Sequence, residues 1–202
     1  MPEMKKNPIA IIGLGNPGNS YKNTRHNVGF MAVDFINQHY NGLFRNVHLH
    51  YEVSEISSGL SSLLLIKPLT YMNLSGLAVD NVLKTYRMNP SDLILVCDDI
   101  HLPVGRMRIR KSGRDGGQKG LRSIFDALGT NTILRIRIGV GILENGDIIE
   151  HVLSDFFDEE MPVVQKCIQM VDQAVFDIIE QGTEYAMNFY NGLNLSSEPC
   201  SL

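Results

Sequence analysis

The stretch IAIIGLGNPG, residues 9–18, decides how the chain folds. Its first four residues are apolar and Gly13 follows them, a pattern typical of a short buried strand that ends in a loop. We therefore expect a strand inside a sheet, with a glycine-rich loop at its carboxyl end.

Predicted helices and strands alternate along the rest of the chain. Helical spacing of apolar residues predicts a helix over 29–40, and two segments, 47–57 and 62–66, predict a hairpin across Ser57-Ser58-Gly59. Further strands are expected at 93–97, 104–111 and 133–140, and further helices at about 73–88, 118–128, 160–181 and 183–190. The acid-rich stretch 144–160 is expected to form a loop and helix inserted at the rim of the sheet.

This alternation predicts an α/β fold: a single domain with a twisted, mixed, mostly parallel central sheet flanked by helices. We assign residues 1–195 to that domain and residues 196–202 to a flexible C-terminal tail. No linker, repeat or low-complexity block interrupts the pattern.

The composition excludes several classes of protein. The chain has 202 residues, of which 44% are hydrophobic and 20% charged, so it can bury a sizeable core. No apolar run is long enough to span a bilayer, and the first residues lack a signal-peptide cleavage site. The three cysteines, Cys97, Cys167 and Cys200, are too scattered for a disulfide framework. We expect a monomer in the cytoplasm, without a membrane partner.

Charge is distributed unevenly along the chain, although the net charge is only −4. Residues 106–137 contain nine Lys or Arg and two acids, whereas residues 144–184 contain eleven acids and one Lys. Such a segment is either a solvated face or a local phosphate-binding surface. The predicted helix start behind Gly116-Gly117 exposes free N–H groups next to Lys119 and Arg122, which would suit a phosphate.

Residues 13–18 match the glycine pattern G-x-G-x-x-G of dinucleotide-binding loops. In those proteins a helix begins directly after the loop, and an acid ends a second strand about 20 residues later. Here residues 19–24 are typical of a loop, and the nearest acid, Asp34, lies in a helical pattern. A nucleotide-dependent enzyme is therefore a distant alternative. The glycines instead allow a sharp turn that lets Asn16 face a cleft.

His26 follows this loop at the expected carboxyl edge of the sheet, where open α/β folds place their sites. The predicted strand 93–97 ends at Asp98-Asp99 and brings carboxylates to the same edge. A lone histidine is usually a surface or core residue. A carboxylate beside it, however, can fix its tautomer and raise its basicity, which makes it a general base.

No side chain is a convincing nucleophile for such a base. The G-x-S-x-G pattern of serine hydrolases is absent from the sequence. Cys97 ends an apolar run and is expected to pack as a small buried hydrophobe. Water is therefore the expected attacking group.

A metal site is not expected. His48, His50 and Glu52 share one face of the predicted strand 47–57 and could hold a metal ion. Alternating polar residues are more typical of the solvent side of a hairpin, and no catalytic zinc spacing is present.

Six segments in order resemble the bacterial-type peptidyl-tRNA hydrolases, over about residues 9–190. Their sequences are GLGNPG at 13–18 with Tyr21, TRHNVG at 24–29, PLTYMNLSG at 68–76, DDIHLPVG at 98–105, GG at 116–117 and RIRIGVG at 135–141.

The resemblance implies a carboxylic ester hydrolase that cleaves the bond between a peptide and the 3′ ribose of tRNA, with no metal or cofactor. On this basis His26 is the general base that activates water, and Asp98 orients it. The side chains implied to bind the peptidyl part or line the cleft are Asn16, Tyr21, Tyr71 and Asn73. The arginines implied to hold tRNA phosphates are Arg108, Arg110, Arg135 and Arg137.

The chain departs from the family pattern after Gly116-Gly117, where Gln118-Lys119 replaces the usual His-Asn. Lys119 cannot accept a hydrogen bond but can donate one to a carbonyl, an oxyanion or a phosphate, so we include it among the substrate-binding residues. Two interpretations stay open: an active peptidyl-tRNA hydrolase, or a catalytically weakened relative that serves as an RNA-binding or scaffold protein.

Overall fold

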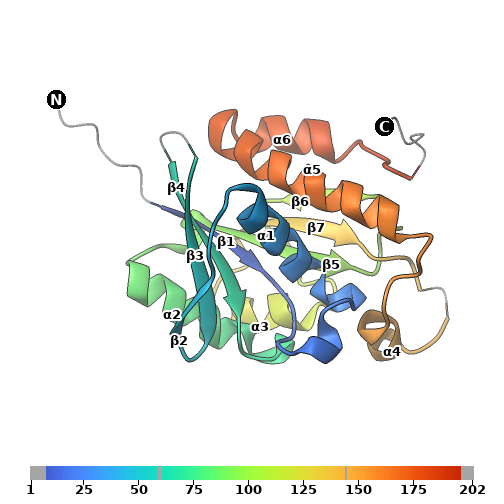
Figure 1. The fold of residues 1–202 in the computed structure, drawn as a ribbon, viewed down its shortest axis with the longest axis horizontal. Coiled ribbons are helices and arrows are strands. Elements are labelled where there is room, and N and C mark those ends of the chain that lie inside the picture. Colours follow the sequence, from blue (N-terminus) through green and yellow to red (C-terminus); the bar gives the residue numbers. More distant parts are fainter. Residues whose placement is uncertain (1–7, 59–60, 144, 197–202) are drawn as a thin grey trace.

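A computed structural model describes residues 8–58, 61–143 and 145–196 of the chain (Figure 1). Seven strands form one sheet in the order β2-β3-β4-β1-β5-β7-β6. The strands are β1 (Ile9–Gly13), β2 (Arg45–His48), β3 (Tyr51–Ser58), β4 (Ser61–Pro68), β5 (Leu93–Asp99), β6 (Met107–Arg110) and β7 (Leu134–Gly139). The longer helices are α1 (Val28–His39), α2 (Ser75–Tyr86), α3 (Lys119–Leu128), α4 (Ile148–Leu153), α5 (Met161–Glu180) and α6 (Thr183–Tyr190).

The sheet is mixed, as predicted. The four central strands β4, β1, β5 and β7 are parallel, whereas β2, β3 and β6 add antiparallel pairs at the two edges. Parallel pairing is therefore confined to the centre of the sheet. All seven residues of β5 are buried, which explains why this strand is apolar up to its last two residues.

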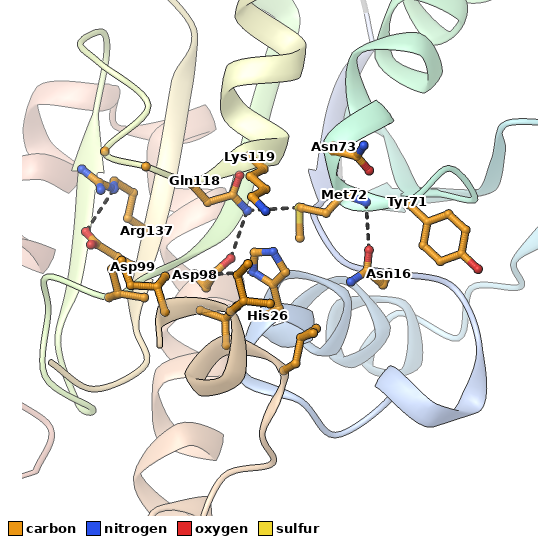
Figure 2. A pocket seen from close by; sticks show the side chains of 17 residues that line it. Asn16, His26, Tyr71, Met72, Asn73, Asp98, Asp99, Gln118, Lys119 and Arg137 are labelled. Atoms are coloured by element: carbon orange, nitrogen blue, oxygen red, sulfur yellow. Dashed lines mark hydrogen bonds and ion pairs between the residues drawn. The ribbon is translucent and has the colours of Figure 1, made fainter. Parts of the chain in front are cut away.

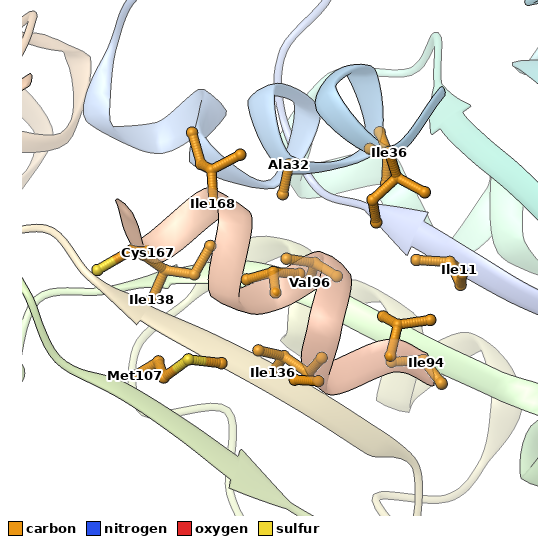
Figure 3. Packing of buried hydrophobic residues seen from close by; sticks show 14 of the residues in the cluster. Ile11, Ala32, Ile36, Ile94, Val96, Met107, Ile136, Ile138, Cys167 and Ile168 are labelled. Carbon is orange, nitrogen blue, oxygen red and sulfur yellow. The ribbon is translucent and has the colours of Figure 1, made fainter. Parts of the chain in front are cut away.

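Helices cover both faces of the sheet and form a three-layered domain (Figure 1). One face packs against α1, α5 and α6, and Figure 3 shows residues of this cluster, among them Val96 of β5 and Ile168 of α5. The other face packs against α2 and α3 through β-strand residues such as Ile12 and Leu95. Two apolar layers thus hold the central strands rigidly, and the loops at their ends are free to carry polar groups.

Most predicted elements lie within a few residues of their expected places, including the short helix α4 inside the acid-rich insertion. The predicted strand 47–57 is wrong, because a turn at residues 49–50 divides it into β2 and β3. His48, His50 and Glu52 consequently do not share a strand face. The predicted strand 104–111 is shorter than expected, because β6 covers only Met107–Arg110. Two predictions fall outside the described residues: the tail beyond residue 196, and the position of Gly59 in the hairpin.

Two further findings concern the described part of the chain. It contains no helix that is both long enough and apolar enough to traverse a lipid bilayer. Nor do three or more His, Cys, Asp or Glu side chains gather there in a way that could hold a metal ion.

The edge strand β6 is covered by one side chain from the end of α6. The Asn191 side chain accepts a hydrogen bond from the Ile109 N–H (2.7 Å) and donates one to the Ile109 carbonyl oxygen (3.3 Å). An unpaired strand edge can add a further strand from another chain. Asn191 therefore takes the place of a neighbouring strand at this point of the edge.

We expect Asn191→Ala to lower the free energy of unfolding by about 1–2 kcal/mol, because it removes both bonds from a half-buried strand. Denaturant unfolding measures the change. Asn81→Ala is the matched control, since Asn81 makes a side-chain bond on the exposed surface of α2, and we expect a change below about 0.5 kcal/mol. Equal losses of unfolding free energy in the two variants would show that the contact with the β6 edge stabilises the fold no more than a surface hydrogen bond does.

Candidate active site

A cavity of about 390 Å³ lies at the carboxyl ends of the central strands β1 and β5 (Figure 2). Its polar lining comes from the loop after β1, the end of β5, the segment before α2 and the start of α3. Its lining side chains include Asn16, His26, Tyr71, Met72, Asn73, Asp98, Asp99, Gln118, Lys119 and Arg137. Most of the residues predicted from the sequence to form the site are thus gathered in one place.

His26 and Asp98 lie side by side at this cavity. The distance between His26 Nδ1 and Asp98 Oδ2 is 3.0 Å, and the two residues are 8% and 2% exposed. A histidine whose Nδ1 faces a carboxylate presents Nε2 as the free nitrogen, and the ring lines the cavity. This arrangement suits a general base that removes a proton from a molecule bound in the cavity.

The residues on either side of His26 anchor it. Arg25, only 2% exposed, donates to the Val140 carbonyl (2.9 Å) and to both carboxylate oxygens of Glu160 (2.7 and 3.1 Å). On the other side, the Asn27 side chain pairs with the backbone N–H and carbonyl of Asn16, at 2.8 and 2.9 Å. His26 is therefore held in a short 3-10 helix whose neighbours are fixed at both ends.

Close backbone packing brings this 3-10 helix to the end of β5. Helix α1 begins directly after it, and Gly29 in its first turn lies against the backbone of Leu14 and Val96. A Cβ atom at position 29 would clash with both. Gly13 faces Gly29 across the same contact, and a side chain there would clash as well. The predicted sharp turn of the glycine loop is thus one part of a tight helix–strand contact.

Amide side chains line the cavity opposite Asp98. The Asn16 Oδ1 atom accepts a hydrogen bond from the Met72 N–H (2.8 Å), which leaves the Asn16 Nδ2 group as a donor (Figure 2). Asn73 is exposed and lines the cavity, as does Tyr71, which is 57% exposed. Tyr21 is not among the lining residues; it packs edge-to-face against Tyr71, with ring centroids 6.5 Å apart.

The start of α3 contributes Gln118 and Lys119. Gln118 is the N-cap of the helix: its Oε1 accepts from the Leu121 N–H (2.7 Å), and its Nε2 donates to Asp98 Oδ1 (3.0 Å). Lys119 is exposed at the cavity, and its ammonium group has no hydrogen-bond or ion-pair partner within the described residues. The cation adds to the positive end of the helix dipole.

The four predicted phosphate-binding arginines share one face of the sheet. Arg108 lies opposite Arg137 across the β6–β7 ladder, and Arg110 lies opposite Arg135. Arg108 and Arg110 are half-buried, and the Arg137 Nε atom is 3.0 Å from Asp99 Oδ2. Arg137 therefore lines the cavity and also has an internal acidic partner, Asp99.

Arg135 does not suit the predicted phosphate contact. It is 1% exposed, and its guanidinium group donates to the backbone carbonyls of Asn131, Ile133 and Arg114. Burial lowers the pKa of this group, and the nearby charges of Arg137 and Arg110 lower it further. These contacts assign Arg135 a structural role at the base of the arginine face.

Cys97 is fully buried, as predicted. Burial raises the pKa of its thiol well above the ordinary value, and the adjacent Asp98 charge adds to this effect. A thiol in this setting is a poor nucleophile. Water remains the candidate attacking group.

Two features of the cavity were missed in the sequence. The first is the role of Gln118, whose signal was its place as the polar first residue of the predicted helix 118–128. The second is an apolar wall from α4, formed by side chains spaced for one face of a helix within an acidic segment: Ile148, Ile149, Val152 and Leu153.

Comparison with known proteins identifies the family to which the chain is similar. A family model described as peptidyl-tRNA hydrolase matches residues 10–198. The peptidyl-tRNA hydrolase of Thermotoga petrophila is 44% identical over 188 residues, which are 93% of this chain and 99% of that protein. The one from Thermodesulfovibrio yellowstonii is 43% identical over 187 residues, which are 92% and 100% of the two chains.

The fold agrees with solved structures as well. The crystal structure of peptidyl-tRNA hydrolase from Acinetobacter baumannii superposes with a TM-score of 0.88 at 30% sequence identity, covering 96% of this chain and 99% of that one. Both relatives cover more than nine-tenths of the chain, and the family model, over residues 10–198, includes every residue that lines the cavity. The chain therefore belongs to the peptidyl-tRNA hydrolase family.

Proposed function

We propose that this protein hydrolyses the ester bond that joins the peptide to tRNA in peptidyl-tRNA. The single observation that carries the proposal is the buried His26–Asp98 pair, 3.0 Å apart, in a cavity that also holds amide and ammonium donors. Family membership supports the substrate class. A scaffold protein would have no use for a carboxylate and an imidazole buried side by side, so the alternative of an inactive relative is not favoured.

In the proposed mechanism, His26 Nε2 takes a proton from a water molecule as the water oxygen bonds to the ester carbonyl carbon. Asp98 holds the ring and stabilises the imidazolium that forms. The carbonyl oxygen becomes an oxyanion, which the donors of Asn16, Asn73 and Lys119 can stabilise. The bond to the ribose 3′ oxygen then breaks, and the imidazolium returns its proton to that oxygen. The products are free tRNA and a peptide carboxylic acid, which loses its proton to the solvent and becomes a carboxylate.

The basic face next to the cavity is proposed to hold the tRNA. Arg108 and Arg110 lie on the α3 side of the sheet edge, where they can meet phosphates without entering the cavity, and Lys119 lies at the cavity itself. Arg137 belongs to this face and also lines the cavity, where it pairs with Asp99. The acid-rich segment, with eleven acids and one Lys, accounts for the negative net charge. We further propose that the protein acts as a monomer in the cytoplasm.

His26→Ala is expected to lower kcat by about 10²–10⁴-fold, because a positioned general base contributes that much to a proton transfer. Release of tRNA from an N-blocked aminoacyl-tRNA at saturating substrate measures kcat. His39→Ala is the matched control and should leave kcat unchanged, since His39 also pairs with a buried aspartate, Asp172 of α5, at 2.7 Å, but at the last residue of α1 and outside the cavity lining. Full activity of the His26 variant would contradict the mechanism.

Arg110→Ala and Arg135→Ala test the arginine face with two residues that are direct cross-strand neighbours. Loss of Arg110 should raise KM for the tRNA substrate and reduce the salt slope of binding by about one, because one phosphate contact disappears. It should leave hydrolysis of a small ester without tRNA unchanged. Loss of the buried Arg135 should instead lower the free energy of unfolding by about 2–3 kcal/mol. If the two variants changed KM and the free energy of unfolding to the same extent, the assignment of Arg110 to tRNA binding and of Arg135 to stability would be wrong.

Lys119 is tested by two substitutions. Lys119→Asn restores the amide that is usual in the family, so kcat should stay the same or rise, while KM rises modestly because a positive charge is lost. Lys119→Ala should lower kcat and raise KM. Steady-state kinetics on the same tRNA substrate separate the two constants. If Lys119→Ala equals the wild type in both, Lys119 points to solvent and takes no part in the reaction.

A further inference from the structure

Both carboxylate oxygens of Asp98 are engaged, and only one of them faces His26. Oδ2 lies 3.0 Å from His26 Nδ1, while Oδ1 accepts the hydrogen bond from Gln118 Nε2, also at 3.0 Å. Asp98 is 2% exposed and Gln118 is 7% exposed, so bulk water cannot easily replace this contact. A buried carboxylate that loses a donor has an unsatisfied acceptor oxygen, which is energetically unfavourable.

The orientation of the Gln118 amide is set by the helix that it caps. Its Oε1 atom accepts from the Leu121 N–H at 2.7 Å, so its only donors, on Nε2, are directed to the opposite side. There Nε2 contacts Asp98 Oδ1 and lies 3.1 Å from the Met72 sulfur (Figure 2). The first turn of α3 and the end of β5 are thereby joined through one amide group.

We infer that Gln118 is a positioning residue for the hydrolysis: its neutral amide fixes the rotation of the Asp98 carboxylate so that Oδ2 stays on His26. This inference rests on the proposed function and adds a residue to it. A cation in the same place would draw the Asp98 charge away from the imidazolium, whereas a neutral donor does not. An amide also does not titrate, so its support of Asp98 is the same across the working pH range.

Gln118→Ser separates this role from helix capping. A serine hydroxyl can still accept from a backbone N–H at the N-cap, but it is too short to reach Asp98. If positioning matters, kcat on an N-blocked aminoacyl-tRNA should fall about 10-fold while KM stays near its wild-type value and the protein stays folded at the assay temperature, because a loosened base loses its near-attack geometry.

Gln118→Glu gives a second and more specific test, since it keeps the shape and the capping oxygen. It places two carboxylates side by side, and such a pair retains a shared proton to a higher pH than a lone carboxyl does. While the proton is present, an O–H group can replace the amide donor; once it is lost, the two charges repel. The kcat of this variant should therefore fall as pH rises through a range in which the wild type keeps its activity.

Asn89→Ser is the matched control. Asn89 is the N-cap residue of the short helix that precedes β5, at the end of the strand far from Asp98. The same change from an amide to a hydroxyl at a cap should leave kcat and its pH dependence unaltered there. Thermal unfolding of all three variants checks that each is folded at the assay temperature.

The outcomes are distinguishable. A lower kcat for Gln118→Ser, together with the alkaline loss for Gln118→Glu, supports the inference. Wild-type kcat and an unchanged pH profile in both variants overturn it and leave Gln118 as a helix cap alone. A wild-type protein that releases no tRNA from the substrate contradicts the proposed function itself, and the inference falls with it.

Discussion

The contact on which the rest of the site depends is the one between the first turn of α1 and the ends of β1 and β5. Gly13 and Gly29 let three backbone segments touch there, with no side chain between them. His26 precedes this turn by two residues, and Asp98 follows Val96 by two. Because a general base works only within hydrogen-bond reach, a wider helix–strand separation would take the histidine away from its carboxylate.

The uneven charge of the sequence also has a structural purpose. Glu160, from the acid-rich segment, pairs with the buried Arg25 and so helps to hold the residue next to His26. Glu184, from the end of the same segment, pairs with Lys111 at the far side of the sheet edge. The acids therefore neutralise cations that shape the scaffold. In the proposed function, the half-buried arginines of β6 keep their charge for the phosphates of tRNA.

Local patterns in the sequence account for most of the fold. Apolar periodicity located β5, α3, α5 and α6, because these elements bury a regular stripe or run. The division between β2 and β3 could not be seen. Leu49, 86% exposed, sits in a turn that contains neither glycine nor proline, and the apolar alternation continues through it.

The candidate site likewise has a part that could be predicted from the sequence and a part that could not. His26 and Asp98 could be predicted to meet, because parallel strands end at one edge and their loops carry the polar groups. The burial of Arg135 could not, since it depends on carbonyls of the two loops that flank α3. Nor could the contact of Gln118 with Asp98, which joins side chains 20 residues apart through the packing of α3 on the sheet. Such contacts join residues that are distant in the sequence and meet only when the chain is folded, so no local sequence pattern predicts them.

The place of Asn191 has a consequence for synthesis of the chain on the ribosome. Strand β6 is paired on one side only, with β7, whose last residue is Gly139, yet Asn191, whose side chain covers the open side, is made about fifty residues later. Until then a nascent chain carries a finished sheet with one open border, during the period when other unfinished chains are close by. The arginines of β6, which repel another copy of the same strand, guard that border in the interval.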